Sequence, residues 1–528
     1  MIRLLDCTLR DGGYLNDWEF GKNIIRYMVE RQILSGEDVI EVGFLDERRP
    51  ADLNRSIQPD TGCYDRLLEG IDKKGAQLFG MIDYGTCSIE HVLPRTNDSI
   101  LDGIRVIFKK PNKEKAVAFA RLIQERGYLV TLQMVSITAY QDRDVLDFCD
   151  QVNGIVPYAV GIVDTYGLMH QEQLMHYFDL LNHNLKPEII LGYHAHNNFQ
   201  LAYSNSIRYL QSRTDRDLLV DGTAFGMGKS AGNAPVELLM MHLNDHYGKH
   251  YDINQVLEII DVYVGRMKGK TLWGYTPTFF LSASNSCHPN YVTYLQSKKT
   301  LSMSGINELL HCIPAENRLD YNKAIIEDLY AQEQKRARNV TYNDGELKTV
   351  LEGKTILLLG PGKTLTDYRE RIQGFMDKVQ PTVISVNCVP QDYNPSFVFI
   401  SNTKRYGLLH YLIHEDKSIQ LIVTSNVGTI SPADYVLEMS RYWEGDSLCA
   451  DNALALLLNI MKQIGPKKLY LAGFDGFSSD GSQNFYKQDL AMADDFERLQ
   501  SVNEELKKRI TKARETLDIE IITPSRYE

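Results

Sequence analysis

The sequence has few of the features that mark secreted or membrane-spanning proteins. Its eight cysteines are scattered, and no two of them are spaced as CxxC. Thiols distributed in this way, in a chain whose N-terminus lacks an apolar leader, are typical of a reduced cytoplasmic protein. No apolar run reaches the roughly 20 residues that span a membrane. We therefore expect a cytoplasmic protein without a membrane span.

Positive charge is also scarce. The chain has 57 Lys and Arg against 69 Asp and Glu, a formal net charge of −12. Proteins that bind nucleic acid carry a basic patch or stripe, whereas the densest basic stretch here, KKPNKEK at 109–115, is explained by the start of a helix. We expect no nucleic-acid partner. With 528 residues, 43% of them hydrophobic, two or three globular domains are expected.

The first half of the chain alternates short apolar runs with amphipathic stretches. The eight predicted strands are residues 2–7, 39–44, 78–83, 103–108, 129–135, 159–165, 189–196 and 218–224. Eight β-then-α units in this length predict a TIM (β/α)8 barrel over residues 1–250. An open doubly wound sheet uses the same alternation, but polar residues at nearly every strand end favour the barrel.

The remainder divides at about residue 345. Residues 251–345 are helical and rich in tyrosine, which predicts a helical extension followed by a charged linker. From 346 to 528 the alternation of strands and helices resumes, with five strand candidates. The predicted fold class is therefore α/β, with an N-terminal TIM barrel, a helical extension and a C-terminal Rossmann-like α/β domain.

Reactive residues of a TIM barrel stand at the carboxyl ends of its strands. The polar candidates there are Arg10, Asp11, Glu41, Asp83, Gln133, Ser136, Asp164, Thr165, His194, His196 and Asp221. His194 and His196 are two residues apart on a predicted strand, so both side chains point to one face. Two such imidazoles are suited to a divalent metal. The alternative is a pair of core histidines with hydrogen-bond partners.

A metal held by two neutral histidines also calls for an anionic oxygen ligand. Asp11 can supply it, because the first strand of a closed barrel lies beside the eighth and near the seventh. Asn233, in a glycine-rich loop after the last strand, offers an amide oxygen. This donor set suits Mn²⁺, Mg²⁺ or Co²⁺, and the imidazoles favour Mn²⁺. The planar guanidinium group of Arg10 is suited to bind a substrate carboxylate or an enolate oxygen. The alternative is that Arg10 forms an ion pair with Glu41.

Five motifs carry a family resemblance. LLDCTLRDGGY, IEVGF, VDTYG, GYHAHNN and GMGKSAGNAPVE occur in this order within residues 1–250. Together they resemble the DRE-TIM metallolyases (the HMG-CoA-lyase-like superfamily), and 4-hydroxy-2-oxovalerate aldolases in particular. The resemblance implies metal ligands at Asp11, His194, His196 and Asn233. It also implies that Arg10 steadies an enolate and that Thr165 binds the substrate carboxylate.

Two departures from the family pattern bear on mechanism. The acyl-CoA lyases of the superfamily carry a cysteine in the glycine-rich loop, and this chain has none there, so the loop is closer to that of the aldolases. The aldolases place a histidine base where this chain has Tyr14. With an unperturbed pKa of about 10, tyrosine is a poor base at neutral pH. His288, Tyr166 and Tyr291 are the other candidates.

The expected function is a divalent-metal-dependent aldolase. It would make or break a C–C bond through a metal-stabilised enolate of pyruvate or a related 2-oxo acid, with an aldehyde as acceptor, a sugar-derived aldehyde being one option. Glu41, Gln133, Ser136 and Asp164 are expected to bind substrate, and Arg10, Tyr14 and Thr165 to take part in catalysis. The alternatives are an acyl-CoA condensing enzyme of the isopropylmalate-synthase kind and an inactive barrel that serves as a binding subunit. A homo-oligomer is expected.

The C-terminal domain has one glycine-rich turn, LLLGPGKTL. Such a turn can present backbone amides to a phosphate, so Gly360, Gly362 and Lys363, with Asn387 and Asp475 at other strand ends, form a candidate phosphate or nucleotide site. A tight structural turn is the alternative. The pattern faintly resembles Rossmann-like domains that use nucleotide sugars, the sialyltransferase-like group among them. A domain for oligomerisation or substrate delivery is the competing reading.

Overall fold

The computed structural model describes residues 1–268, 271, 273–298, 301–336, 341–444, 448–487, 490 and 496–528. The chain forms two compact units, Met1–Pro289 and Asn290–Glu528. The division falls within residues 251–345, the expected helical extension. Its first helices therefore belong to the barrel unit, and its last ones to the second unit.

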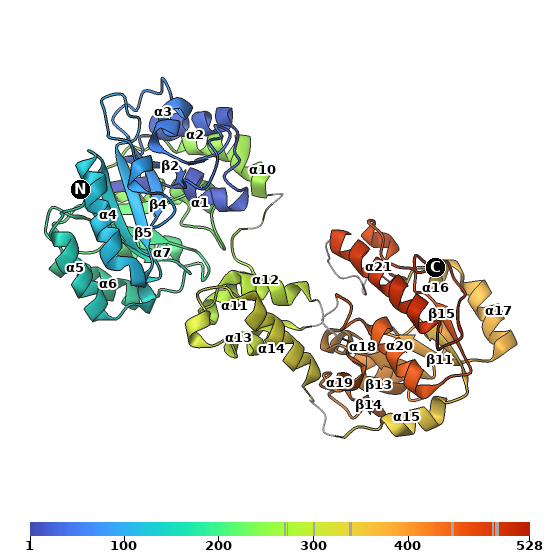
Figure 1. Cartoon of the computed structure of the whole chain (residues 1–528). Helices are drawn as coiled ribbons and strands as arrows, with labels where there is room; N and C mark the ends of the chain where they lie inside the picture. Colours follow the sequence, from blue (N-terminus) through green and yellow to red (C-terminus); the bar gives the residue numbers. More distant parts are fainter. Residues whose placement is uncertain are drawn as a thin grey trace. The chain divides into compact units, whose positions relative to one another are not determined.

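A closed barrel of eight parallel strands forms the first unit, as the sequence predicts (Figure 1). β1 pairs with β9 on one side and with β2 on the other, which closes the ring. The strands are β1 (Ile2–Asp6), β2 (Val39–Leu45), β4 (Gln77–Asp83), β5 (Gly103–Phe108), β6 (Leu129–Met134), β7 (Ala159–Asp164), β8 (Ile190–Ala195) and β9 (Leu218–Gly222), and the two-residue β3 (Ile57–Gln58) pairs with β2.

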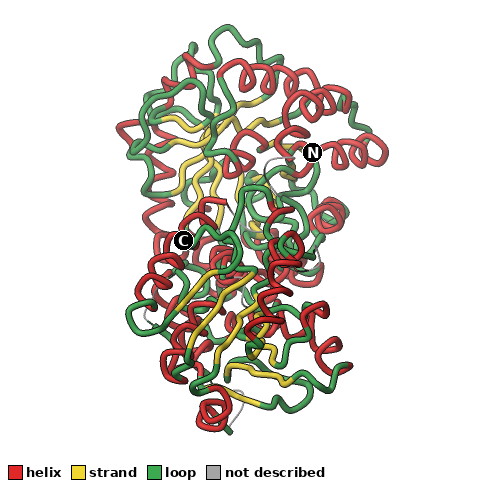
Figure 2. Tube along the Cα trace, turned by 90° about the vertical axis from the view of Figure 1, so that its right-hand side faces the viewer, coloured by secondary structure: helices red, strands yellow, loops and turns green. Residues whose placement is uncertain are grey.

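Helices surround the strands of the barrel (Figure 2). The helices of the first unit are α1 (Thr8–Asp11), α2 (Lys22–Ser35), α3 (Thr61–Leu67), α4 (Lys113–Glu125), α5 (Asp142–Asn153), α6 (Gln171–Asn184), α7 (Ala202–Leu210), α8 (Val236–Tyr247), α9 (Ile253–Ile259), α10 (Gly265–Lys268) and α11 (Pro277–Ser284). In α4, Ala116, Ala120 and Ile123 recur at helical spacing and are buried. α4 begins at Lys113, within the basic stretch at 109–115, so this stretch contains the start of a helix, as expected.

The barrel interior changes from apolar to charged along its axis. Residues of one apolar cluster, among them Val39 and Leu219, fill one layer of the interior. Because side chains two residues apart on a strand share a face, Glu41 and Asp221 lie one layer further toward the carboxyl ends of the same strands. Both are buried. The strand period thus places ionisable groups directly beneath the barrel mouth.

The second unit holds a parallel, Rossmann-like α/β sheet. Its order is β14-β13-β12-β11-β10-β15-β16, and every pairing is parallel. The strands are β10 (Thr355–Leu359), β11 (Thr382–Val386), β12 (Phe397–Ile400), β13 (Gln420–Thr424), β14 (Tyr435–Leu437), β15 (Lys468–Ala472) and β16 (Ile519–Ile521). The five predicted strands are present, and the sequence missed β14 and β16 because three-residue edge strands carry little pattern.

Both faces of this sheet are apolar, as expected of a parallel sheet covered by helices. Leu358 and Ile384 belong to one core cluster, and their neighbours Leu357 and Val383 to another. The helices are α12 (Pro289–Ser297), α13 (Met303–His311), α14 (Lys323–Lys335), α15 (Asp344–Leu351), α16 (Thr364–Asp367), α17 (Arg369–Val379), α18 (Thr403–Glu415), α19 (Met439–Tyr442), α20 (Ala453–Ile464) and α21 (Phe496–Ala513).

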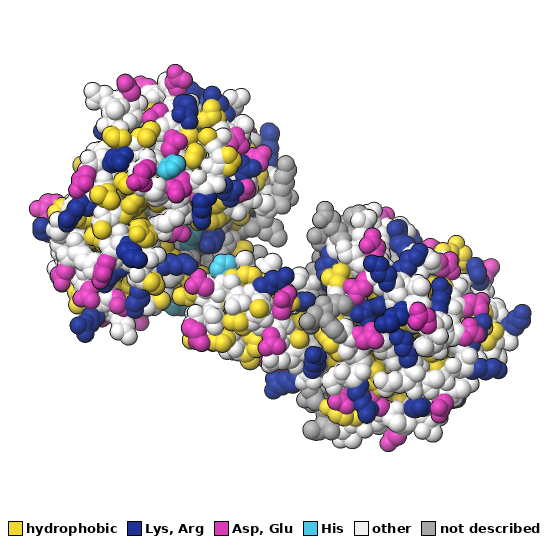
Figure 3. Space-filling model, in the orientation of Figure 1, with side chains coloured by type: hydrophobic (Ala, Val, Ile, Leu, Met, Phe, Trp, Pro, Cys, Tyr) yellow, Lys and Arg dark blue, Asp and Glu magenta, His cyan; other side chains and the backbone are white. Residues whose placement is uncertain are grey.

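Charge is mixed over the surface. On the face shown in Figure 3, basic and acidic side chains are interspersed over both units. None of the helices in the described part of the chain combines the length and apolarity needed to cross a membrane.

Candidate metal centre

The chain after β1 turns at once across the barrel mouth. The single-turn helix α1 carries Arg10 and Asp11, whose exposed fractions are only 4% and 1%. The turn is held from the next loop, where the indole Nε1 of Trp18 donates to the Arg10 carbonyl at 2.8 Å. A Cβ at Gly13 would lie 2.0 Å from the Trp18 ring, so glycine is required for this contact. The Asp-Gly-Gly sequence therefore lets the loop fold back with Asp11 facing inward.

The two histidines of β8 lie on one face, with ring centroids 5.1 Å apart. His194 Nδ1 lies 3.1 Å from an Asp221 carboxylate oxygen, and His196 Nδ1 lies 3.2 Å from the Gly232 carbonyl oxygen. Because these acceptors require a proton on each Nδ1, each Nε2 is left as a lone-pair donor. Burial lowers the pKa of His196 to about 4, which keeps that imidazole neutral near pH 7. His196 is therefore in the state that a metal binds, and the contact of His194 Nδ1 with Asp221 leaves its Nε2 directed away from that carboxylate.

Asp11 completes a group of potential ligands. One ligand atom from each of Asp11, His194 and His196 lies within 4.8 Å of the others, and all three residues are buried. Although burial opposes ionisation, Arg10 and the two imidazoles hold the pKa of Asp11 well below its usual range. The candidate ligands are therefore one carboxylate and two imidazoles, and the structure brings together the residues expected from the sequence.

Asn233 provides a fourth donor to this group. It is bridged to His196 across the mouth, and its Nδ2 donates to Asp11 Oδ2 at 2.5 Å. Its Oδ1 is buried and has no hydrogen-bond partner in the described part of the chain. An orphaned amide oxygen beside a carboxylate and two imidazoles is costly unless it binds something. A divalent cation fits this donor set.

Gly228 leaves room over the ligands. A Cβ at this position would lie 2.3 Å from Asp11 Oδ2 and 2.2 Å from Asn233 Nδ2. We predict that Gly228→Ala weakens Mn²⁺ binding by about tenfold to a hundredfold, the usual cost of disturbing groups that orient ligands. Isothermal titration of the purified protein with MnCl₂ measures this. Gly374→Ala, at a helical position with open space, is the control, and equal affinities for the two variants would contradict the prediction.

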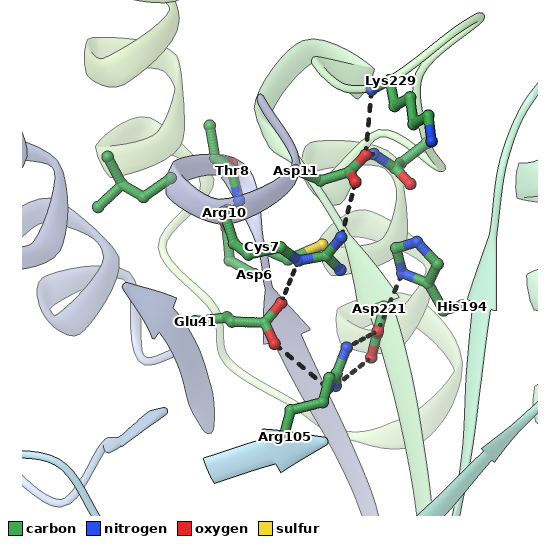
Figure 4. Close-up of polar contacts among 12 residues, drawn as sticks. Asp6, Cys7, Thr8, Arg10, Asp11, Glu41, Arg105, His194, Asp221 and Lys229 are labelled. Atoms are coloured by element: carbon green, nitrogen blue, oxygen red, sulfur yellow. Dashed lines mark hydrogen bonds and ion pairs between the residues drawn. The ribbon is translucent and has the colours of Figure 1, made fainter. Parts of the chain in front are cut away.

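A chain of buried ion pairs extends beneath the site (Figure 4). Arg10 donates from Nη1 to Asp11 at 2.6 Å and from Nε to Glu41 at 2.7 Å. Arg105 continues the chain, with Nη1 donating to Asp221 at 2.6 Å and Nε lying 3.3 Å from Glu41. Burial would raise the pKa of Asp221, but Arg105 and His194 lower it to about 2. The ion pair between Arg10 and Glu41, left open by the sequence, is present.

The charges of this network are close to balance. Two guanidinium groups face three carboxylates, those of Asp11, Glu41 and Asp221. The Lys229 ammonium adds a third positive charge, and the Asp11 carboxylate favours its charged form. The fit to a metal therefore rests on the geometry of the ligands and on the Asn233 oxygen that has no partner among the described residues.

A second cluster of metal-binding residue types lies nearby but is less suited to a cation. Cys7, His194 and Asp221 also have ligand atoms within 4.8 Å of one another. Burial raises the pKa of the Cys7 thiol, whose Sγ donates to the Gly222 carbonyl. Asp221 is already paired with Arg105. In this cluster, Asp221 orients the His194 ring through its contact with Nδ1.

Sequence reasoning listed Asp221 as a polar strand-end residue without a specific role, and it left out Arg105 and Lys229 as functional candidates. Arg105 interrupts the apolar strand GIRVIF, and a charged residue in a buried strand is a signal that the sequence offers. Asp221 was visible as a strand-end residue, but its role as the partner of His194 depends on the fold. The Lys229 ammonium lies 5.1 Å from the centre of the Tyr14 ring.

Tyr14 lies at the rim of the site, with its ring edge-on to Trp18 and Phe44. Desolvation and the Asp11 carboxylate raise the pKa of its phenol. The hydroxyl therefore keeps its proton at neutral pH, which makes Tyr14 unsuited to act as a base. The alternative Tyr291 has its hydroxyl 2.8 Å from the Asn317 carbonyl oxygen within the second unit, and its side chain is fully buried.

The other strand-end candidates have different surroundings. Thr165 Oγ1 accepts from the Ser136 amide at 2.8 Å, which leaves the threonine proton free to donate. Gln133 is buried against Gly161 of the neighbouring strand, where a Cβ would lie 2.7 Å from its Nε2. The Asp164 carboxylate accepts from the amides of Leu168 and Met169, so it shapes its own loop. Burial raises the pKa of Asp164 to about 6.

The glycine-rich turn of the second unit is closed by its own structure. Gly360 and Gly362 donate their amides to carbonyl oxygens after β15, both at 2.8 Å. Asp475 accepts from the Thr364 amide at 2.8 Å, in the position that a phosphate would take at this turn. Lys363 Nζ donates to Gln483 at 2.6 Å. These contacts are those of a tight structural turn.

The fold and this donor set define a metal-dependent TIM-barrel enzyme, and comparison with known proteins agrees. The HMGL-like family model matches residues 106–262. A 4-hydroxy-2-oxovalerate aldolase of Marinomonas sp. (strain MWYL1) is 31% identical over 252 residues, 46% of this chain and 70% of the relative. An oxaloacetate decarboxylase of Mycobacterium tuberculosis is 25% identical over 240 residues, 46% and 69% of the two chains.

Among solved structures, the N-terminal domain of a Bacteroides vulgatus protein assigned as an aldolase is 24% identical, with a TM-score of 0.48. The match covers 58% of this chain and 99% of that domain. The chain belongs to the HMGL-like family within the DRE-TIM metallolyase superfamily. It is an enzyme of the kind this family contains, a divalent-metal-dependent lyase, aldolase or condensing enzyme.

Proposed function

We propose that the protein is an aldolase that forms or cleaves a C–C bond between a 2-oxo acid, such as pyruvate, and an aldehyde. The ligand group of Asp11, His194, His196 and Asn233 carries this proposal. Relatives named as aldolases of 4-hydroxy-2-oxovalerate and as an oxaloacetate decarboxylase support it, because both names describe 2-oxo acids. Manganese suits the mixed imidazole and oxygen donors. When bound, the divalent ion supplies Lewis acidity that favours the enolate of the 2-oxo acid.

The neighbouring side chains have roles that follow from their contacts. Arg10 donates from Nε to Glu41 and from Nη1 to Asp11. Its Nη2 donates to no group among the described residues, so this nitrogen can donate to a substrate oxygen. The Thr165 hydroxyl can donate a hydrogen bond to the substrate carboxylate. Tyr14 keeps its proton and can donate a hydrogen bond to the oxygen of the aldehyde, in both the forward and the reverse reaction. Tyr14 is therefore proposed to polarise and position the aldehyde, without the proton transfer that the family pattern suggested for this position.

Lys229 extends the site toward an anionic substrate. Its ammonium covers the Tyr14 ring, and its backbone amide donates to Asp11 Oδ2 at 3.2 Å. Burial lowers its pKa, while the acids Asp11 and Asp83 oppose that shift. A desolvated cation at the mouth is suited to a carboxylate or phosphate on the substrate.

Lys229→Met tests this role. Because a hydrogen bond to a charged group is worth about 1.5–3 kcal/mol, we predict a fall of about tenfold to a hundredfold in kcat/KM for anionic substrates, mostly through KM. Lys110→Met, which removes an exposed lysine paired with Asp144, serves as the control. Steady-state kinetics with pyruvate and paired charged and neutral aldehydes measure the effect. An equal loss for both kinds of aldehyde, with an unchanged KM for pyruvate, would contradict it.

Enolate formation itself has a direct test that needs no aldehyde. The Mn²⁺-loaded protein should exchange the methyl protons of pyruvate with D₂O, followed by proton NMR, and EDTA should stop the exchange. Absence of exchange with both pyruvate and 2-oxobutyrate would count against an aldolase. A 2-isopropylmalate synthase of Sulfolobus acidocaldarius is 25% identical over 279 residues. Thiol release from acetyl-CoA in the presence of a 2-oxo acid would instead show a condensing enzyme.

A further inference from the structure

The second unit contains a cavity at the carboxyl edge of its sheet. It has a volume of about 220 Å³ and is lined by residues that follow β10, β11, β12 and β15, among them Pro361, Asn387, Asn402 and Phe474. The chain runs from β10 to β11 on one side and returns to β15 on the other side of β10. In open parallel sheets, ligands bind beyond the strand ends at this reversal of strand order.

Two helices begin at the cavity wall. Asn402 and Arg405 stand at the start of α18, and Asn452 and Ala453 at the start of α20. Both helices exceed eight residues, and each N-terminus carries the partial positive charge of the helix dipole. The N-cap side chains already take part of the amides, since Asn402 accepts from Arg405 and Asn452 accepts from Leu454 and Ala455. The two helix N-termini therefore give this part of the wall a positive potential.

Arg405 is an independent sign of an anion-binding site. Its side chain is 5% exposed, and its Nη2 donates to the Leu490 carbonyl at 2.7 Å. Its Nη1 is buried and has no hydrogen-bond partner in the part of the chain that the structure describes. Burial lowers its pKa, as expected of a desolvated cation without a carboxylate partner. Asn387 also has a buried Oδ1 without a partner there.

The rest of the wall combines further cations with aromatic rings. Lys298 and Arg498 also line the cavity. Of the two acids in the lining, Asp475 is bound by Thr364 and Asp451 accepts from the Tyr330 hydroxyl. The aromatic lining residues are Phe474, Phe477, Phe485 and Tyr527. The Arg405 guanidinium lies over the Phe485 ring, with Cζ 5.5 Å from its centre.

We propose that this cavity binds a nucleoside phosphate. Its phosphate would lie at the starts of α18 and α20, beside Arg405, and its base against the aromatic wall. A cation beside flat apolar rings matches a ligand that joins a phosphate to a planar base. Pro361 and Gly362 of the glycine-rich turn line the cavity, but the amides of Gly360 and Gly362 are already bonded, so the phosphate is placed at Arg405 and not at that turn.

Titration calorimetry of the full chain with CMP, UMP and AMP tests the proposal, with cytidine, uridine, adenosine and inorganic phosphate as comparison probes. At least one nucleotide should bind at least tenfold more tightly than its nucleoside and than phosphate. Arg405→Met should weaken that binding at least tenfold, because it removes a charged hydrogen-bond donor. Arg371→Met, an exposed position on α17 outside the cavity lining, should leave it unchanged.

A second variant is needed as a control for misfolding. Arg405 also donates to the Leu490 carbonyl, so its replacement can disturb the local fold. Asn387→Asp places a carboxylate in the cavity wall and should repel the phosphate while keeping the native melting temperature. The proposal fails if no nucleotide binds at millimolar concentration or if phosphate alone binds as tightly as every nucleotide. It also fails if folded Asn387→Asp binds nucleotide like the parent. These readouts do not depend on aldolase activity.

Discussion

Asp11→Ala is expected to abolish Mn²⁺ binding. Measured in excess Mn²⁺, its kcat/KM should be lower than that of the parent by about three orders of magnitude or more. Asp11 is the only carboxylate in the ligand group with His194 and His196, and its second oxygen orients the Asn233 amide. Its loss leaves two neutral imidazoles and an amide, too weak a set to hold the cation. A metal contribution of several kcal/mol to the barrier corresponds to a loss of this size.

Calorimetry with MnCl₂ and the pyruvate exchange reaction measure the two effects separately. Asp17→Asn is the matched control, because Asp17 lies six residues further along the same loop and is exposed in surface ion pairs. Such pairs contribute little, so this variant should keep its metal. Stoichiometric Mn²⁺ in folded Asp11→Ala would show that the ligand assignment is wrong.

Arg105→Met should be the most destabilising single change in the network beneath the site. Arg105 is fully buried and ion-paired with both Asp221 and Glu41. Removing one partner of a buried pair typically costs about 3–5 kcal/mol, because the remaining charges stay buried and unpaired. We expect a loss of this size in the free energy of unfolding, together with weaker metal binding, since Asp221 also holds His194.

Chemical denaturation followed by circular dichroism measures the loss in stability. Arg49→Met is a suitable control, because Arg49 is a partly exposed arginine of the same unit whose partner Asp17 is also accessible to solvent. It should lose about 1 kcal/mol or less. If the two variants were equally stable, the ion-pair chain would have no energetic role.

The sequence predicted the barrel because eight short apolar runs alternate with amphipathic stretches, and polar residues stand at or near almost every strand end. The same period-two rule placed His194 and His196 on one face. It did not yield the partner of each imidazole. Asp221 and the Gly232 carbonyl reach their histidines only when β8, β9 and the loop after β9 lie side by side.

Local patterns were less informative where tertiary contacts decide the outcome. The turn at Gly360 and Gly362 has a phosphate-binding appearance, but Asp475 arrives from a distant strand and takes the amide of Thr364. Tyr14 stands where the family pattern has a base, and only its surroundings show that its pKa is raised. Strand β16 has three residues and forms only because β15 is beside it. Contacts between distant segments made each of these differences.

Crystallographic anomalous scattering from Mn²⁺ tests the central claim most directly. The account predicts one strong manganese peak in the barrel mouth, within coordination distance of Asp11, His194 Nε2 and His196 Nε2, with Asn233 Oδ1 turned toward it. A pyruvate-bound crystal should place the 2-oxo acid between that peak and Arg10. A peak beside Cys7 and Asp221 instead, or no peak in the barrel of a crystal soaked in millimolar Mn²⁺, would contradict the account.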